Sequence, residues 1–100
     1  MIDWSRVVGF DWDSGNERKS VDKHRASRAE AEQAFFNQPL LVLEDDRHSA
    51  AERRFHALGN TSAGRRLHVT FTLRRDATLI RVISARDMSA KERATYEETA

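Results

Sequence analysis

The chain has 100 residues, of which 33% are charged and 39% hydrophobic, so it can build one modest core with little apolar surplus. No apolar stretch approaches the roughly 18–20 residues that a membrane-spanning helix needs, and the first residues lack the basic and apolar regions of a signal peptide. Cysteine is absent, which excludes disulfides, thiolate zinc ligands and a cysteine nucleophile. We therefore expect one cytoplasmic domain over residues 1–100 that does not contact a membrane.

Charge is distributed unevenly along the chain. Residues 1–46 hold six basic and ten acidic side chains, whereas residues 47–86 hold nine arginines and only two acids. A basic block nearly free of acids is typical of a surface that meets a polyanion. A genome that favours arginine codons would explain why Arg outnumbers Lys fourteen to three, but it would not explain the scarcity of acids.

The first half of the chain predicts one strand and two helices. The strand covers residues 7–12, with Val8, Phe10 and Trp12 on one face. Two capping boxes follow, at residues 14–17 and 27–30, each with Ser and Glu three positions apart. The first opens a short helix to about residue 24. The second opens a helix that carries an apolar stripe and ends at Pro39.

The second half predicts four strands, at residues 40–44, 52–59, 66–74 and 79–86. The last three are joined by short links, and such links imply antiparallel neighbours. A third capping box at residues 89–92 opens a helix to about residue 98. The fold class is therefore α+β, with the order β-α-α-β-β-β-β-α and an antiparallel twisted sheet that has its helices packed on one face.

Alternation along two of these strands predicts a polar side of the sheet. In residues 66–74 every second side chain is apolar, which leaves His68 and Thr70 on the opposite face. In residues 52–58, Phe55 shares the packed face, so the opposite face carries Glu52, Arg54 and His56. Arg65 and Arg66 would lie at its rim. The alternative is an ordinary solvated face with weak cross-strand ion pairs.

The strand at residues 79–86 has apolar side chains at both odd and even positions, and so on both of its faces, as expected for a central strand. Strict alternation directs Arg81 and Arg86 to opposite sides of the sheet. The two arginines share one side only if the strand bulges near Ser84.

These side chains suit cleavage of RNA, which carries its own nucleophile in the 2′-hydroxyl. Arginine matches phosphate oxygens and stays charged, whereas Glu and His can move protons. We assign Glu52 as general base and His56 as auxiliary acid. Arg54 and Arg81 stabilise the phosphorane, Arg86 clamps phosphate, and neither a metal nor a cofactor is required. Further RNA contacts are expected from Arg53, Arg65, Arg66, His68, Lys23 and His24.

Four motifs follow one another in order along nearly the whole chain. They are Phe10-Asp11-Trp12-Asp13 with Lys23-His24; Glu52-x-Arg54-Phe55-x-x-Leu58-Gly59; Gly64-Arg65-x-Leu67-x-Val69; and Ile80-Arg81-Val82-Ile83-Ser84-Ala85-Arg86 with Glu92-x-x-x-Tyr96-Glu97. The last is the most specific. Together they resemble the BrnT-type toxin family.

The resemblance implies a RelE-like fold and a metal-independent endoribonuclease that cleaves mRNA and halts translation. It also implies a BrnA-like ribbon-helix-helix antitoxin, with operator DNA bound only through the toxin–antitoxin complex. Glu52, Arg54, Arg81 and Arg86 match family positions, whereas the role of His56 rests on strand parity alone. Two other classes stay open: a nucleic-acid-binding module without catalysis, and an interaction domain whose arginines seat an acidic or helical partner. The antitoxin could cover the cationic face or bind the helices.

Overall fold

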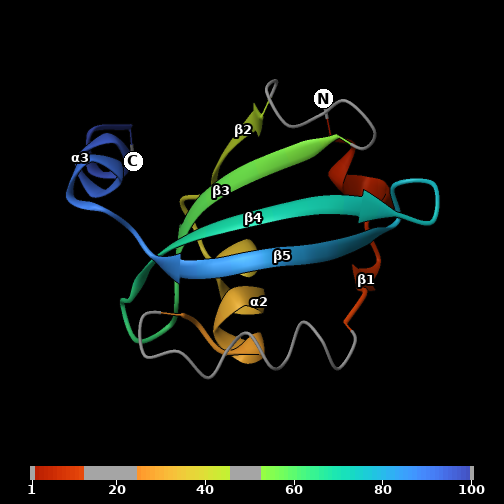
Figure 1. Cartoon of the computed structure of the whole chain (residues 1–100), viewed down its shortest axis with the longest axis horizontal. Coiled ribbons are helices and arrows are strands. Elements are labelled where there is room, and N and C mark those ends of the chain that lie inside the picture. Colours follow the sequence, from red (N-terminus) through yellow and green to blue (C-terminus); the bar gives the residue numbers. More distant parts are fainter. Residues whose placement is uncertain (1, 13–24, 46–52, 100) are drawn as a thin grey trace.

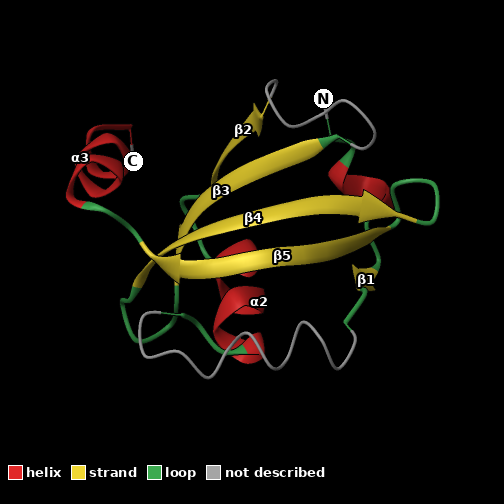
Figure 2. Cartoon of the chain, viewed as in Figure 1, coloured by secondary structure: helices red, strands yellow, loops and turns green. Residues whose placement is uncertain are grey.

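The computed structural model of the chain describes residues 2–12, 25–45 and 53–99. Their strands form one sheet in the order β1-β5-β4-β3-β2, with α2 behind it and α3 beyond one end (Figures 1 and 2). The elements are η1 (Trp4–Arg6), β1 (Gly9–Phe10), α2 (Arg28–Phe36), β2 (Leu41–Asp45), β3 (Arg54–Asn60), β4 (Arg66–Arg74), β5 (Leu79–Asp87) and α3 (Ala90–Thr99). The α+β class is confirmed. The helix predicted up to residue 24 lies outside the described residues.

Two of the predicted capping boxes are present at the starts of α2 and α3. The Ser27 side chain accepts a hydrogen bond from the Glu30 backbone N–H, and the Glu30 carboxylate accepts one from the Ser27 N–H. Ser89 and Glu92 form the same reciprocal pair. Each box satisfies two backbone donors that would otherwise lack a partner, so the sequence fixes where both helices begin.

The sheet is mixed, which corrects the prediction of an antiparallel one. β1 pairs in parallel with β5, through Gly9 with Leu79 and Phe10 with Ile80. Short links imply antiparallel pairing only between consecutive strands, and β1 and β5 are separated by most of the chain. The first strand is also shorter than predicted, and Val8 is 79% exposed.

The two long helices lie on different faces, which corrects the prediction that all helices pack on one. α2 packs through Ala31 and Ala34 in the main core with Ala57 of β3. α3 instead packs Tyr96 against Leu58, the next residue along β3, which points to the other face. No helix in the described part of the chain is long and apolar enough to cross a membrane.

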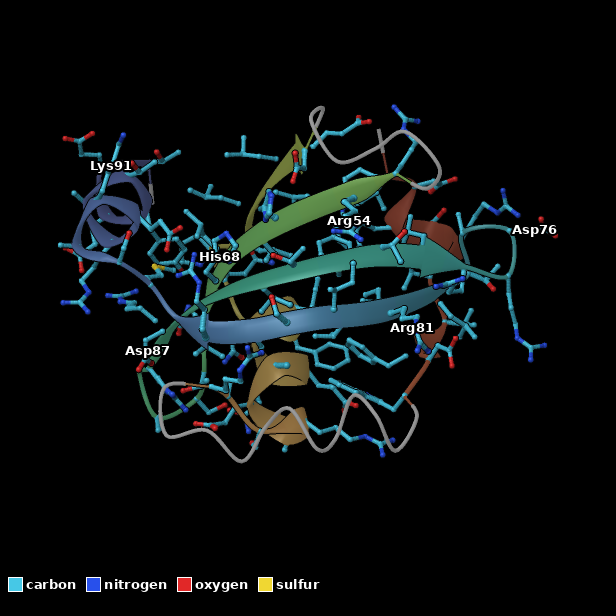
Figure 3. The ribbon with its side chains drawn as sticks, in the orientation of Figure 1. Arg54, His68, Asp76, Arg81, Asp87 and Lys91 are labelled. Carbon is cyan, nitrogen blue, oxygen red and sulfur yellow. The ribbon has the colours of Figure 1, made fainter. Side chains whose placement is uncertain are left out.

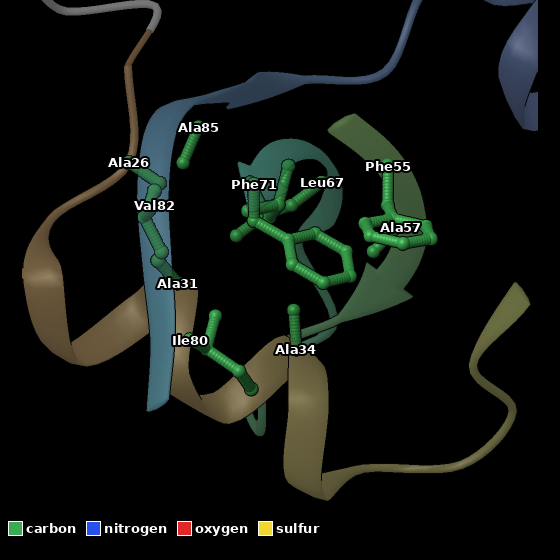
Figure 4. Close-up of a cluster of buried hydrophobic side chains, with 11 residues drawn as sticks. Ala26, Ala31, Ala34, Phe55, Ala57, Leu67, Phe71, Ile80, Val82 and Ala85 are labelled. Carbon is green, nitrogen blue, oxygen red and sulfur yellow. The ribbon is translucent and has the colours of Figure 1, made fainter. Parts of the chain in front are cut away.

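The main core is a layer of rings and small residues between the sheet and α2 (Figure 4). Phe71 is fully buried and contacts the rings of Trp4, Phe35 and Phe55, with centroids 5.0–6.4 Å away. α2 approaches β3 closely because Gly59 has no side chain. A Cβ there would lie 2.7 Å from a backbone oxygen of the helix.

A bulge in β5 decides which way its arginines point. Thr70 of β4 faces Ser84, but the next residue, Phe71, faces Val82, so Ile83 is the extra residue. The bulge reverses the alternation beyond it. Arg81 and Arg86 consequently lie on the same side of the sheet, the outcome that strict alternation had excluded.

Candidate functional site

The side of the sheet opposite α2 carries a group of polar side chains that we call the polar face. Its members are Arg54, His56, His68, Thr70, Thr72, Arg81, Ser84 and Arg86. The strand register arranges them in three rows across the sheet, spaced about 7 Å apart, because two residues separate successive rows. Figure 3 shows Arg54 and Arg81 toward the η1 end and His68 toward α3.

The first row, the arginine row, brings together two guanidinium groups from different strands. Asp45 of β2 pairs with Arg54 of β3, and Thr72 of β4 pairs with Arg81 of β5. The register of β3 with β4 places Arg54 beside Thr72. Beyond Arg81, the carboxylate of Asp11 lies 3.5 Å from its guanidinium. The row therefore holds two permanent cations between acids at its two ends.

The second row, the histidine row, contains His56, Thr70 and Ser84. Both ring nitrogens of His56 have partners: Nε2 lies 2.9 Å from Asp45 Oδ2, and Nδ1 lies 3.1 Å from Thr70 Oγ1. An imidazole held between a carboxylate and a hydroxyl has a fixed orientation and a route for a proton. This row lies beside the arginine row.

The third row, the Arg86 row, contains His68 of β4 and Arg86 of β5 next to α3. Arg86 makes two hydrogen bonds to the Glu92 carboxylate, at 2.9 and 3.0 Å. His68 is 9% exposed, its ring centroid lies 4.9 Å from that of His56, and its buried Nδ1 has no hydrogen-bond partner among the described residues. This row lies about 13 Å along the strands from the arginine row, and the guanidinium of Arg86 is held by Glu92 whereas that of Arg81 lies beside Asp11.

Some residues that the sequence assigned to the site are held elsewhere. Arg53 makes two hydrogen bonds to Glu44, whose register with Phe55 places the pair on the α2 side. Arg65 binds Asp87, Glu30 and the backbone of the segment before α2, so it acts as a structural clamp and does not line the rim. These contacts correct the predicted rim position of Arg65, whereas the RNA contacts expected of Arg53 and Arg65 stay predictions.

The other assigned residues lie beside α3 or are not described. Arg66 lies over the Tyr96 ring of α3 at 5.1 Å and 3.7 Å from Glu97, with its side chain 37% exposed, and its RNA contact stays a prediction. Glu52, Lys23 and His24 lie outside the described residues, so their predicted roles stay predictions. In the described part of the chain, no three His, Asp or Glu side chains are grouped to hold a metal ion.

Sequence reasoning missed two acids of this face. Asp45 was interpreted as part of a turn, but it is the last residue of β2 and holds His56. The alternation of side chains along β2 puts Asp45 on the same face as Leu41 and Leu43, and this pattern could have assigned it to the polar face. Glu92 was predicted as a helix cap and as part of the last motif, without a partner on the sheet. Its contact with Arg86 depends on how α3 folds back, and no sequence pattern shows that.

Two ionisable groups of the Arg86 row should make the protein sensitive to acid. Hydrogen bonds from Arg86 lower the pKa of Glu92 from 4.5 to about 2. Burial lowers the pKa of His68 from 6.5. Both groups bind protons more readily in the unfolded chain, so the free energy of unfolding should fall as the pH drops below 6.5, and again from 4.5 to about 2.

Urea unfolding over this pH range checks the prediction. His68→Gln should remove the first decline and keep the second, because Glu92 is unchanged. Equal stability of the wild type at about pH 7 and about pH 5.5 would contradict the assignment to His68.

Comparison with known proteins decides the family. The model of the family described as "Ribonuclease toxin, BrnT, of type II toxin-antitoxin system" matches residues 12–92. The chain belongs to the BrnT family. The resemblance drawn from the motifs is thus confirmed, and a BrnT ribonuclease toxin implies an RNA substrate and an antitoxin partner. No curated protein matches the sequence.

Proposed function

We propose that this BrnT-family chain is an endoribonuclease that cleaves mRNA, and so inhibits translation, without a metal ion. The observation that carries the proposal is the arrangement of Arg54, Arg81 and His56 in adjacent rows of one face. Two fixed cations stand where a phosphodiester could lie across the sheet, and a group able to move protons stands beside them. Cleavage of RNA, the activity that the family description names, is promoted by both kinds of group.

In the proposed reaction, Glu52 takes the proton from the 2′-hydroxyl of RNA. The 2′-oxygen attacks phosphorus, the bond to the 5′-oxygen breaks, and that oxygen receives a proton from the Nδ1 side of His56. Arg54 and Arg81 stabilise the charge that develops on the phosphorane oxygens. The products are a 2′,3′-cyclic phosphate and a 5′-hydroxyl, with no water or metal consumed.

Asp45 supports this role of His56 by holding Nε2 in place. With Nε2 held in this way, Nδ1 is the ring nitrogen that faces the Thr70 hydroxyl of the polar face and can exchange a proton there. Arg86 would contact a second phosphate of the same strand, since its row lies about 13 Å away.

The partner is proposed to be a BrnA-like ribbon-helix-helix antitoxin that neutralises the toxin in the cytoplasm. Operator DNA would be bound only by the complex of the two proteins. The type II toxin–antitoxin family supports a protein partner of some kind. Co-expression with the neighbouring short reading frame tests its class: restored growth and co-purification of a ribbon-helix-helix protein are expected, and an unrelated antitoxin fold would exclude this class.

The experiment that tests the function is incubation of purified protein with a defined RNA in the presence of EDTA, followed by analysis of the new ends. We expect cleavage that leaves 2′,3′-cyclic phosphate and 5′-hydroxyl ends and is blocked by 2′-O-methylation at the cut site. Activity that disappears with EDTA, or 5′-phosphate ends, would contradict the mechanism. Binding of intact RNA without cleavage would favour a non-catalytic module, and no binding at all would favour an interaction domain.

A further inference from the structure

The carboxylate of Glu92 accepts hydrogen bonds from two elements, and a histidine of a third element lies near it. Arg86 of β5 donates two hydrogen bonds to it, at 2.9 and 3.0 Å, and the Ser89 N–H before α3 donates another at 2.9 Å. His68 Nε2 of β4 lies 3.7 Å from the same carboxylate. A single anionic group therefore holds β4, β5 and the start of α3 together.

The same donors would suit a phosphate. The planar guanidinium fork of Arg86 matches two oxygens of a phosphate as well as those of a carboxylate. The backbone N–H before α3 and the positive end of this ten-residue helix also favour an anion. The largely buried His68 directs its Nε2 toward the carboxylate, and this nitrogen could move closer to a phosphate oxygen at the same place. These features describe an anion site that the chain fills with its own acid.

We propose that Arg86, His68 and the Ser89 N–H form a second phosphate site for RNA, and that Glu92 competes with RNA for it. This inference rests on the proposed function, and it adds that Glu92 limits the affinity of the protein for RNA. The guanidinium of Arg86 binds Glu92 in a row about 13 Å from the arginine row, so we assign it a different phosphate from the one that is cleaved. Glu92 thus lowers the affinity of the toxin for RNA without touching the reacting phosphate.

The replacement Glu92→Gln tests the competition. Glutamine can keep the capping box, since its side-chain oxygen still accepts from the Ser89 N–H, but it removes the charge that holds Arg86. The dissociation constant for a 2′-O-methyl RNA that cannot be cleaved should fall by about 3- to 10-fold at low salt, and log Kd should depend on log salt more steeply by about one unit.

Two matched variants make the result specific. Glu98→Gln removes the same charge from an exposed position of the same helix, and it should change the affinity by less than about twofold. In the double variant Glu92→Gln/Arg86→Ala the gain should vanish. Should Glu92→Gln unfold, NMR of the Arg86 side chain in the wild type gives the answer, because RNA must shift its Nε resonance when phosphate replaces Glu92.

The outcomes separate this inference from the proposed function. If the wild type binds RNA but Glu92→Gln binds no tighter than Glu98→Gln, the second site is wrong while the ribonuclease proposal stands. A gain that survives Arg86→Ala also overturns the site. If no variant binds RNA, both proposals fail.

Discussion

Replacing Arg81 with alanine should slow RNA cleavage by about 10²- to 10³-fold, the loss typical when one group that stabilises transition-state charge is removed. Arg81 and Arg54 lie in the same row of the polar face, on β5 and β3, with Thr72 of β4 between them. The phosphorane gains charge as the 2′-oxygen attacks, so a cation aimed at it lowers the barrier more than it strengthens binding. The measurement is the single-turnover rate at saturating protein.

Two comparison variants show which property of the Arg81 side chain accounts for the slower cleavage. Arg93→Ala removes a cation from an exposed position of α3 and should leave the rate nearly unchanged. Arg81→Lys keeps the charge but loses the planar fork, so an intermediate rate is expected. Circular dichroism must show that each variant is folded. An Arg81→Ala protein that cleaves RNA as fast as the wild type would remove Arg81 from the mechanism.

Phe71→Ala should lower the free energy of unfolding by about 3–5 kcal/mol, the usual cost of deleting a buried aromatic ring. Phe71 is fully buried and touches the rings of Trp4, Phe35 and Phe55. Removal of its ring opens a cavity between the sheet and α2. The loss is large because the whole free energy of unfolding of a small domain is only about 5–15 kcal/mol. Urea unfolding gives the difference.

Phe36→Ala is the matched control for this core substitution. Phe36 is 72% exposed although it belongs to the helix that covers the core, so the same change should cost less than about 1 kcal/mol. If the two variants lost equal stability, the core would not be centred on Phe71.

Local signals in the sequence located most elements of the described chain. Ser27 and Ser89 marked the starts of α2 and α3, and alternation gave β4 the bounds that the structure has, Arg66–Arg74. Capping and alternation are short-range effects, so they can be read from neighbouring residues. The same alternation assigned Arg54 and His56 to one face.

Features that depend on distant contacts could not be predicted. The parallel pairing of β1 with β5 joins segments about seventy residues apart. Alternation along β2 could assign Asp45 to the polar face, but its pairing with His56 depends on the register of β2 with β3. The position of Arg86 depends on a bulge at Ile83, which is set by the pairing with β4 and not by the residues of β5 alone. The ion pairs of Arg65 with Asp87 of β5 and Glu30 of α2 also join distant segments, so the sequence could not predict them.

Mapping the RNA contact surface by NMR, with a 2′-O-methyl RNA that cannot be cleaved, tests most directly whether RNA binds the polar face. We expect backbone amide shifts to concentrate on β3, β4 and β5 around His56, Thr70 and Ser84, with side-chain shifts at Arg54 and Arg81. Shifts concentrated on α2 and η1, with the polar face unchanged, would contradict this prediction.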